Sequence, residues 1–356
     1  MNGLYYADGV FTYSSDCWLF CFLRKECRKN LYISSSEIMK KFIFKIFIML
    51  LILCSLTLIV NYAYVYAKCD MNYDGDSTDK FIHMDDGIQI SNTGSSHGMR
   101  SFQYDDIDQY KCFNFALTSQ SLSYDYRLVS YYQDNLAENG VMFIPISYFS
   151  LFGKDETEAE DFKSLDQRYY KVLPPDMIKG YDLKTDIYVN YLPALNAYEK
   201  FFMPFVGYVP ENTYVNMNSN LLGREAELPE RGYGRYLMHV VDGKFDESGN
   251  RIINYNEVEA LYGIIGVCQK KGIRPLLITT PYTKEYVDAV KENDPDFFND
   301  FYAVIEEVTR ATGAEYYDYS EDIRFARQYG LFLDADHLNV DGGKQFTEII
   351  IEELVQ

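Results

Sequence analysis

Residues 42–67 form an apolar run in which Lys45, near its start, is the only charged residue. A helix of about 20 apolar residues spans the hydrocarbon core of a bilayer, so this run is long enough to cross a membrane. Lys40 and Lys41 precede it, and tyrosines gather at its far end, as aromatic side chains do at a membrane interface: Tyr62, Tyr64 and Tyr66. The positive-inside rule therefore predicts a single-pass protein of the cell membrane, with everything after residue 67 extracytoplasmic.

The start of translation and the cleavage of this run each have two interpretations. Met39 begins a short basic stretch followed by apolar residues, which is typical of the start of a signal-anchor protein. Residues 1–38 show no clear helical or strand period, so we expect translation to begin at Met39; a short cytoplasmic tail is the alternative. A small-residue cleavage site at Ala63 or Ala67 would make the run a signal peptide, and we favour the uncleaved anchor.

Charge and residue counts limit the chemistry. The chain has 356 residues, with 33 Lys and Arg against 53 Asp and Glu, and a net charge of -20 at pH 7. Such a chain repels polyanions, which argues against nucleic acid as a partner. A general base that works near neutral pH must come from one of four histidines: His83, His97, His239 and His337. Because no Cys/His cluster has zinc-ligand spacing, we predict no metal and no other cofactor.

An acidic linker is expected at residues 68–80, followed by a domain over 81–356 in which strand and helix signals alternate. Predicted strands cover 87–92, 112–117, 141–146, 274–281 and 314–318. Predicted helices cover 121–138, 256–271, 296–312 and a final stretch from Gly342 or Gly343 to the end. This alternation favours an α/β fold with a parallel sheet covered on both faces. Residues 153–250 are polar, rich in Tyr and interrupted by Pro and Gly, so we expect an insertion that forms a cap or side lobe.

Two short segments carry residues suited to nucleophilic catalysis. Ser96 lies in the loop sequence SNTGSSHG, directly after the first predicted strand, where its hydroxyl would lie at the carboxyl edge of the sheet. Asp334 precedes His337 by three residues, just before the last predicted helix, so its carboxylate can fold back and orient the imidazole. Asp336 competes for that role, and the spacing favours Asp334. The same residue types are also common in ordinary loops and helix entries.

Together the GSS loop and the DxxH segment resemble the SGNH/GDSL hydrolase superfamily, and the GSS form with a membrane anchor is closest in style to the DltD-like acyl-transfer proteins. The resemblance runs from about Gly87 to the end of the chain and leaves the 153–250 insertion unmatched. It implies a three-layer flavodoxin-like SGNH fold. It also implies Ser96 as nucleophile, His337 as base and Asp334 as the orienting acid.

The family's other blocks match in part. Asn114 falls on the Asn of the second block, and Ser119 stands where the family has Gly, so the resemblance implies an oxyanion hole made by the N–H groups of Ser96 and Ser119. The third block, Gly-x-Asn, should fall near residues 147–150, where the chain has no Asn. One donor is therefore missing or comes from elsewhere, such as the insertion.

Three further residues are candidates for the border of the pocket. His97 adjoins Ser96, although on a helix its side chain would point about 100° away, and a packed or solvent-facing histidine is the alternative. Asn114 is the second. Asn339 is the third, and we expect it to cap or orient its loop rather than to react.

The resemblance implies a serine esterase or O-acyltransferase on the surface of a bacterium. Its substrate would be an acyl ester of a glycan or wall polymer, and a membrane-bound O-acyltransferase would be its partner. The alternative is a catalytically inactive glycan-binding or accessory subunit of such an acyltransferase complex, which the missing third-block Asn favours.

Overall fold

The computed structural model describes residues 16–66, 78–82, 84–154, 166–196 and 219–355. The chain divides into two compact units, Met1–Ala67 and Lys68–Gln356. Most of the expected acidic linker lies outside the described residues.

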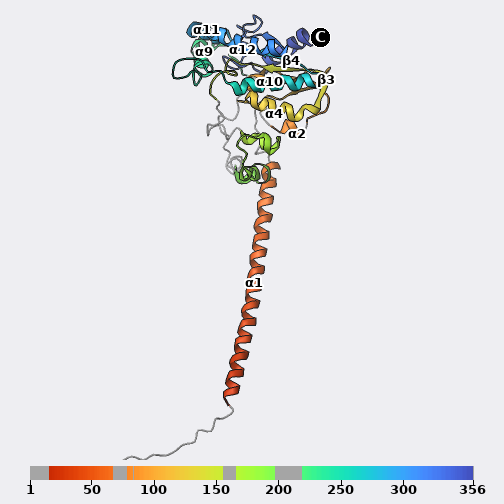
Figure 1. The fold of residues 1–356 in the computed structure, drawn as a ribbon, viewed down its shortest axis with the longest axis vertical. Helices are drawn as coiled ribbons and strands as arrows, with labels where there is room; N and C mark the ends of the chain where they lie inside the picture. The colour runs from red at the N-terminus through yellow and green to blue at the C-terminus, as the bar shows by residue number, and fades with distance from the viewer. Residues whose placement is uncertain (1–15, 67–77, 83, 155–165, 197–218, 356) are drawn as a thin grey trace, which may run out of the picture. The chain divides into compact units, whose positions relative to one another are not determined.

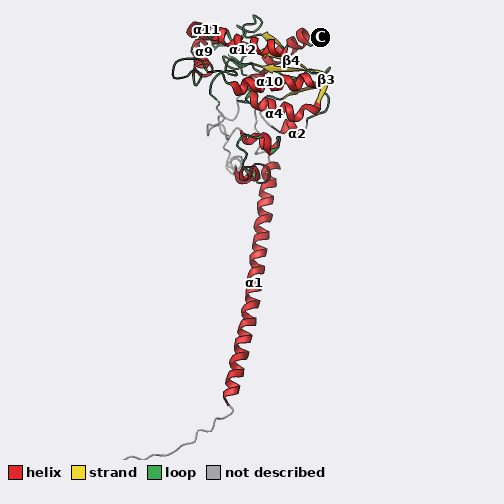
Figure 2. Ribbon diagram, viewed as in Figure 1, coloured by secondary structure: helices red, strands yellow, loops and turns green. Residues whose placement is uncertain are grey.

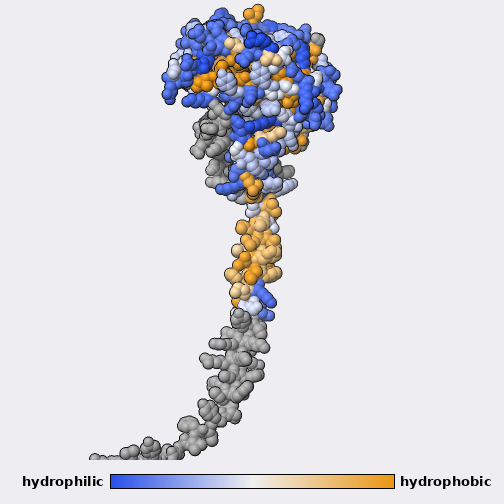
Figure 3. Space-filling view, in the orientation of Figure 1, coloured by the Kyte–Doolittle hydropathy of each residue, from blue (hydrophilic) through white to orange (hydrophobic). Residues whose placement is uncertain are grey.

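The first unit contains one long helix, α1 (Asp16–Tyr66). Its stretch Ser35–Tyr64 has 30 residues and a mean hydropathy of 2.8, and none of its most apolar window is buried. Figure 3 shows this stretch as a column of hydrophobic side chains. Its length and composition fit a single membrane span or a signal sequence. The helix begins well before Met39, in a segment where the sequence had shown no helical period.

The second unit is built on a five-stranded, all-parallel sheet in the order β2-β1-β3-β4-β5. Its strands are β1 (Ile88–Asn92), β2 (Cys112–Asn114), β3 (Leu136–Pro145), β4 (Arg274–Thr279) and β5 (Glu315–Asp318). Figure 2 shows them as yellow arrows among red helices. The predicted α/β fold with a parallel sheet is confirmed. This strand order is flavodoxin-like, and it places the topological switch point between β1 and β3, where ligands bind beyond the carboxyl ends of the strands.

Both faces of the sheet are covered, because alternate residues of the central strand enter different cores. Met142 and Ile144 of β3 join one apolar cluster, and Phe143 joins the other. Helices α4 (Leu122–Tyr132), α10 (Tyr255–Lys270) and α12 (Phe297–Thr312) contribute to the first cluster. Helices α3 (Ser96–Ser101) and α13 (Val340–Leu354) pack on the other face. Figure 1 shows α4 beside α10, in agreement with their many contacts.

Helix α4 ends earlier than the sequence predicted. It stops at Tyr132 and is followed by a short turn, η1 (Gln133–Asn135), instead of continuing to residue 138. The apolar Leu136 had extended the helical pattern, but it is buried in β3, where it pairs with Ile88 of β1. Helix α11 (Lys284–Asn293) was not predicted. The remaining short helices of the framework are α2 (Asp79–Ile82) and η9 (Tyr329–Leu331).

The segment between β3 and β4, where the insertion was expected, contributes no strand to the sheet over its described residues. Within the described residues of 153–250, the longest helix is α9 (Leu228–Tyr236), which continues into the π-helical turn η8 (Leu237–Val241). Helix α9 packs against α11. The shorter segments are η3 (Gln167–Lys171), η4 (Pro175–Met177), α6 (Leu183–Asp186), η5 (Ile187–Tyr191), α7 (Pro193–Asn196) and η7 (Glu225–Glu227).

Candidate active site

The turn between β1 and α3 presents Ser96 at the carboxyl edge of the sheet. Ser95 caps α3, and its hydroxyl accepts a hydrogen bond from the backbone N–H of His97. Gly98 makes the turn sterically possible, because a Cβ atom there would lie 2.3 Å from the carbonyl oxygen of Thr93. The nucleophile candidate therefore begins a helix at the switch point of the sheet, as the sequence predicted.

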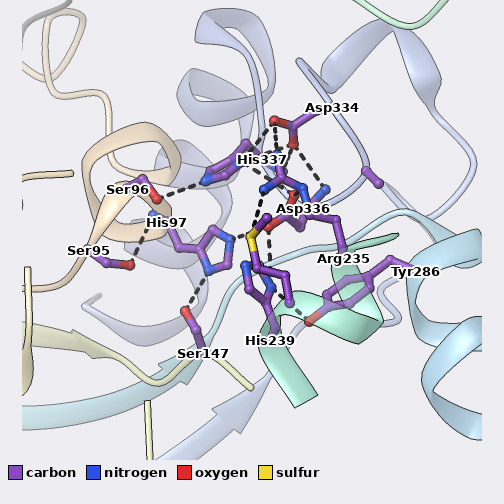
Figure 4. A network of polar contacts seen from close by, with 12 residues as sticks. Ser95, Ser96, His97, Ser147, Arg235, His239, Tyr286, Asp334, Asp336 and His337 are labelled. Atoms are coloured by element: carbon purple, nitrogen blue, oxygen red, sulfur yellow. Dashed lines mark hydrogen bonds and ion pairs between the residues drawn. The ribbon is translucent and has the colours of Figure 1, made fainter. Parts of the chain in front are cut away.

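The structure brings Ser96, His337 and Asp334 together in a hydrogen-bonded chain (Figure 4). The Oγ atom of Ser96 lies 2.8 Å from Nε2 of His337. On the other side of the ring, Nδ1 lies 2.9 Å from Oδ1 of Asp334. That carboxylate oxygen also accepts the backbone N–H of His337, at 2.9 Å, so the loop itself folds Asp334 back onto the imidazole. A nucleophile, a base and an orienting acid in this order form a general arrangement for activating serine.

Asp336, the competing acid, also lies beside the imidazole. Its Oδ1 atom is 3.4 Å from Nδ1 of His337, against 2.9 Å for Asp334. Its side chain is fully buried, and its Oδ2 atom lies 3.0 Å from Nε2 of His97. The hydrogen-bond geometry therefore favours Asp334 as the orienting acid, while Asp336 adds a second negative charge close to the same ring.

His97 does not point away from the site as the helical angle suggested. It is 1% exposed, and its ring centroid lies 4.6 Å from that of His337. A carboxylate can only accept, so Nε2 of His97 donates to Asp336, and Nδ1 accepts from the hydroxyl of Ser147 at 2.6 Å. Burial lowers the pKa of His97, so the ring is neutral. Ser147, at the expected third block, thus contacts a histidine where the family has an Asn side chain.

The two carboxylates govern the charge of His337. Burial lowers its pKa, but the negative charges of Asp336 and Asp334 outweigh burial and raise the pKa to about 9. In turn, burial raises the pKa of Asp336, while His337 and the hydrogen bond from His97 hold it well below its ordinary value. At neutral pH the resting site therefore holds an imidazolium whose Nδ1 side faces two carboxylates.

The insertion supplies two residues that sequence reasoning did not assign to the site. Arg235, on α9, donates from Nη2 to Oδ2 of Asp334 at 2.9 Å, and its Nε atom lies 2.7 Å from Oδ1 of Asp336. His239, on η8, has Nδ1 3.1 Å from the hydroxyl of Tyr286 and 3.6 Å from Asp336. Burial lowers the pKa of His239 to about 3. No local motif marked either residue, because their partners lie far away in the sequence.

A cavity of about 690 Å³ opens beside Ser96. The framework contributes Ser96, His97, Ser119, Phe149, Asp334 and His337 to its wall, and the insertion contributes Lys154, Asp166, Arg168, Tyr169, Arg235, Met238, His239 and Lys244. The volume is within the range of small-molecule sites, about 300–1,000 Å³. The described part of the insertion therefore forms one wall of the cavity.

Ser119 adopts a backbone conformation that favours glycine, with φ of 53°. The SGNH pattern that the sequence resembles has glycine at this position. Among the described residues, nothing accepts a hydrogen bond from its backbone N–H. Ser119 also lines the cavity.

Asn114 and Asn339 do not line the cavity, in contrast to their predicted place at its border. Asn114 is held below it, where its Oδ1 atom accepts from the N–H of Ala116 and its Nδ2 atom donates to the carbonyl of Phe102. Asn339 caps α13 by accepting the N–H of Gly342 at 2.9 Å, which confirms the expected capping role. Their amides are engaged in holding loops rather than facing a ligand.

One cluster in the described residues has the spacing of a metal site. Ligand atoms of His97, Asp336 and His337 all lie within 4.8 Å of one another. Arg235, however, already places a permanent positive charge 2.7 Å from the carboxylate of Asp336. Because that charge repels a metal cation, the donor set fits a proton-transfer network better than a metal centre.

No protein-family model matches the chain, and no curated protein matches it either.

Proposed function

We propose that this protein is a membrane-anchored, extracytoplasmic serine esterase or O-acyltransferase of the SGNH type. The main support is the hydrogen-bonded chain from Ser96 through His337 to Asp334, whose residues line a cavity of small-molecule size. Ser96 lies near the start of the domain's sequence, and Asp334 and His337 lie near its end, which agrees with the SGNH pattern that the sequence resembles.

The geometry supports the following reaction. Ser96 Oγ attacks the carbonyl carbon of an acyl ester while its proton moves to Nε2 of the neutral form of His337, which becomes the main form above about pH 9. Asp334 holds the ring and stabilises its positive charge. Backbone N–H groups of Ser96 and Ser119 stabilise the oxyanion of the tetrahedral intermediate. The intermediate then expels the alcohol, which takes the proton from His337 and leaves the acyl group esterified to Ser96.

A second half-reaction regenerates the serine. His337 removes a proton from an incoming hydroxyl, whose oxygen attacks the acyl carbon. The bond from the acyl carbon to Ser96 Oγ then breaks, and Ser96 takes the proton back from His337. Water gives hydrolysis, and a sugar hydroxyl gives acyl transfer. The many charged side chains of the cavity favour a polar substrate such as an acylated glycan over a long lipid chain. The wall polymer and the membrane acyltransferase partner rest on the family resemblance alone.

Turnover of a simple ester tests this proposal. The full-length protein in detergent micelles is mixed with p-nitrophenyl acetate, with and without a methyl glycoside as acceptor. We expect release of p-nitrophenolate, and acetylated glycoside in the acceptor arm, both abolished by Ser96→Ala and by His337→Gln. A folded protein without either product, or with activity unchanged by both substitutions, would contradict it. Glycan binding without turnover would support the accessory-subunit alternative.

A further inference from the structure

Helix α9 of the insertion delivers one cation to both acids of the candidate active site. The Nη2 atom of Arg235 donates to Asp334 at 2.9 Å, on the carboxylate that holds His337. Its Nε atom lies 2.7 Å from Oδ1 of Asp336 but is not aligned as a hydrogen bond, so this second contact is electrostatic. The side chain of Arg235 is 27% exposed and lines the cavity.

The charges around His337 show why this cation matters. Asp334 and Asp336, in its own loop, both lie within ion-pair distance of its ring. The histidines that approach from other elements are His97 on α3 and His239 on η8, and burial lowers the pKa of both, so they carry no charge at neutral pH. Among the described residues, Arg235 is the only permanent cation within ion-pair distance of either acid.

The position of Arg235 is fixed by close packing of its helix. Gly232, one turn earlier on α9, lies so close to α11 that a Cβ atom there would come within 2.6 Å of the carbonyl oxygen of Glu285. An alanine at this position would force α9 away from α11, and Arg235 with it. The approach of the two helices therefore sets the reach of the guanidinium to the acids.

We propose that Arg235 is a positioning residue of the Ser96–His337–Asp334 site, which holds Asp334 against the imidazole and offsets the negative charge of Asp336. This inference rests on the proposed function of that site. It makes the insertion part of the catalytic centre as well as a wall of the cavity. Without the cation, two unbalanced carboxylates would retain the proton on His337, and the base would become available only at higher pH.

The test measures the rate of covalent labelling by a fluorophosphonate, in which Ser96 attacks phosphorus and fluoride leaves. Rates for the full-length protein in detergent are recorded from pH 6 to 10. Arg235→Gln removes the charge but keeps a hydrogen-bond donor, and Arg235→Lys keeps the charge. Arg224→Met is the matched control, because it removes an exposed arginine of the same insertion that pairs with Glu227. Thermal unfolding of each variant checks folding.

We expect Arg235→Gln to label at least about 10-fold more slowly at pH 7.5, with the midpoint of its pH profile about one unit higher than in the wild type. Arg235→Lys should keep the midpoint within about half a unit, at a reduced rate, because one ammonium cannot reach both acids as the guanidinium does. Arg224→Met should match the wild type. Equal midpoints for a folded Arg235→Gln variant and the wild type would overturn the inference.

If Arg235→Gln does not fold, the pH profile of labelling of Gly232→Ala tests the inference instead. This substitution keeps every charge but moves α9, so the inference predicts an upward shift of the midpoint, and an unchanged profile would overturn it. A wild-type protein that never labels would instead contradict the proposed function itself, which keeps the two failures distinct.

Discussion

The pH dependence of serine reactivity follows directly from the electrostatics of His337. The general base must be neutral to accept the proton of Ser96, and the charges of Asp336 and Asp334 raise its pKa to about 9. Burial and the carboxylates of Asp334 and Asp336 set this value. Arg235 on α9 pairs with both acids, and the neutral His97 and His239 lie beside Asp336. Activity should therefore increase as pH rises and these charges no longer retain the proton.

The expected magnitude is large. With a pKa of about 9, roughly 1% of the imidazole is neutral at pH 7, so the labelling rate should rise about 10-fold per pH unit between pH 6 and 8 and level off above about 9. The measurement is the second-order rate constant of fluorophosphonate labelling across this range. A midpoint near 6.5, the ordinary value for histidine, or a flat profile would refute the electrostatic reasoning.

Two variants separate the roles of the acids. Asp336→Asn removes the largest charge acting on His337, so the midpoint should fall by about one unit or more while the plateau rate changes little. Asp334→Asn removes the carboxylate that orients the ring, and the plateau rate should fall about 10²–10⁴-fold. The reverse pattern would show that Asp336 is the orienting acid.

Three further predictions concern stability, measured by thermal or denaturant unfolding. His337 has a folded pKa of about 9, above its ordinary 6.5, so its ionisation adds roughly 3 kcal/mol to the free energy of unfolding below about pH 6.5, and this contribution is lost as pH rises through 9. His337→Gln should flatten this fall of stability with pH. An equal slope in the variant and the wild type would contradict the prediction. Burial raises the pKa of Asp125 to about 7, so its ionisation destabilises the fold as pH rises from about 4 to 7. Asp125→Asn should therefore raise the free energy of unfolding by about 1–3 kcal/mol at pH 8 and have no such effect at pH 4. A less stable variant at pH 8 would contradict the prediction. Gly98→Ala should lower the free energy of unfolding by about 2 kcal/mol or more and suppress labelling, because its Cβ would clash with the Thr93 carbonyl. A variant as stable as the wild type would mean that the turn is not constrained.

The family resemblance, and not local spacing alone, singled out Ser96, Asp334 and His337, whose side chains the structure brings together. Ser96 follows a buried strand and begins a helix, and the three-residue spacing of Asp334 and His337 lets the loop fold the carboxylate onto the ring through the backbone N–H of His337. Both features depend on residues that are neighbours in the chain. The parallel sheet then brings the two loops to one edge.

The surroundings of the centre were not predictable in the same way. Arg235 lies 99 residues from its partner Asp334, in a polar segment without a motif. His97 was expected to turn away from Ser96, yet both side chains reach the cavity, because the first turn of α3 faces it and a 100° step does not carry the next residue out of it. Such contacts depend on tertiary packing rather than on spacing.

The most direct test of Ser96 as the activated nucleophile is to locate the labelled residue. Full-length protein in detergent is treated with a fluorophosphonate at pH 9, where His337 is half neutral, and the adduct is mapped by peptide mass spectrometry beside Ser96→Ala and His337→Gln. We expect one adduct, on Ser96, that is absent from Ser96→Ala and strongly reduced in His337→Gln. A folded protein without an adduct, or an adduct on another serine that persists in Ser96→Ala, would contradict it.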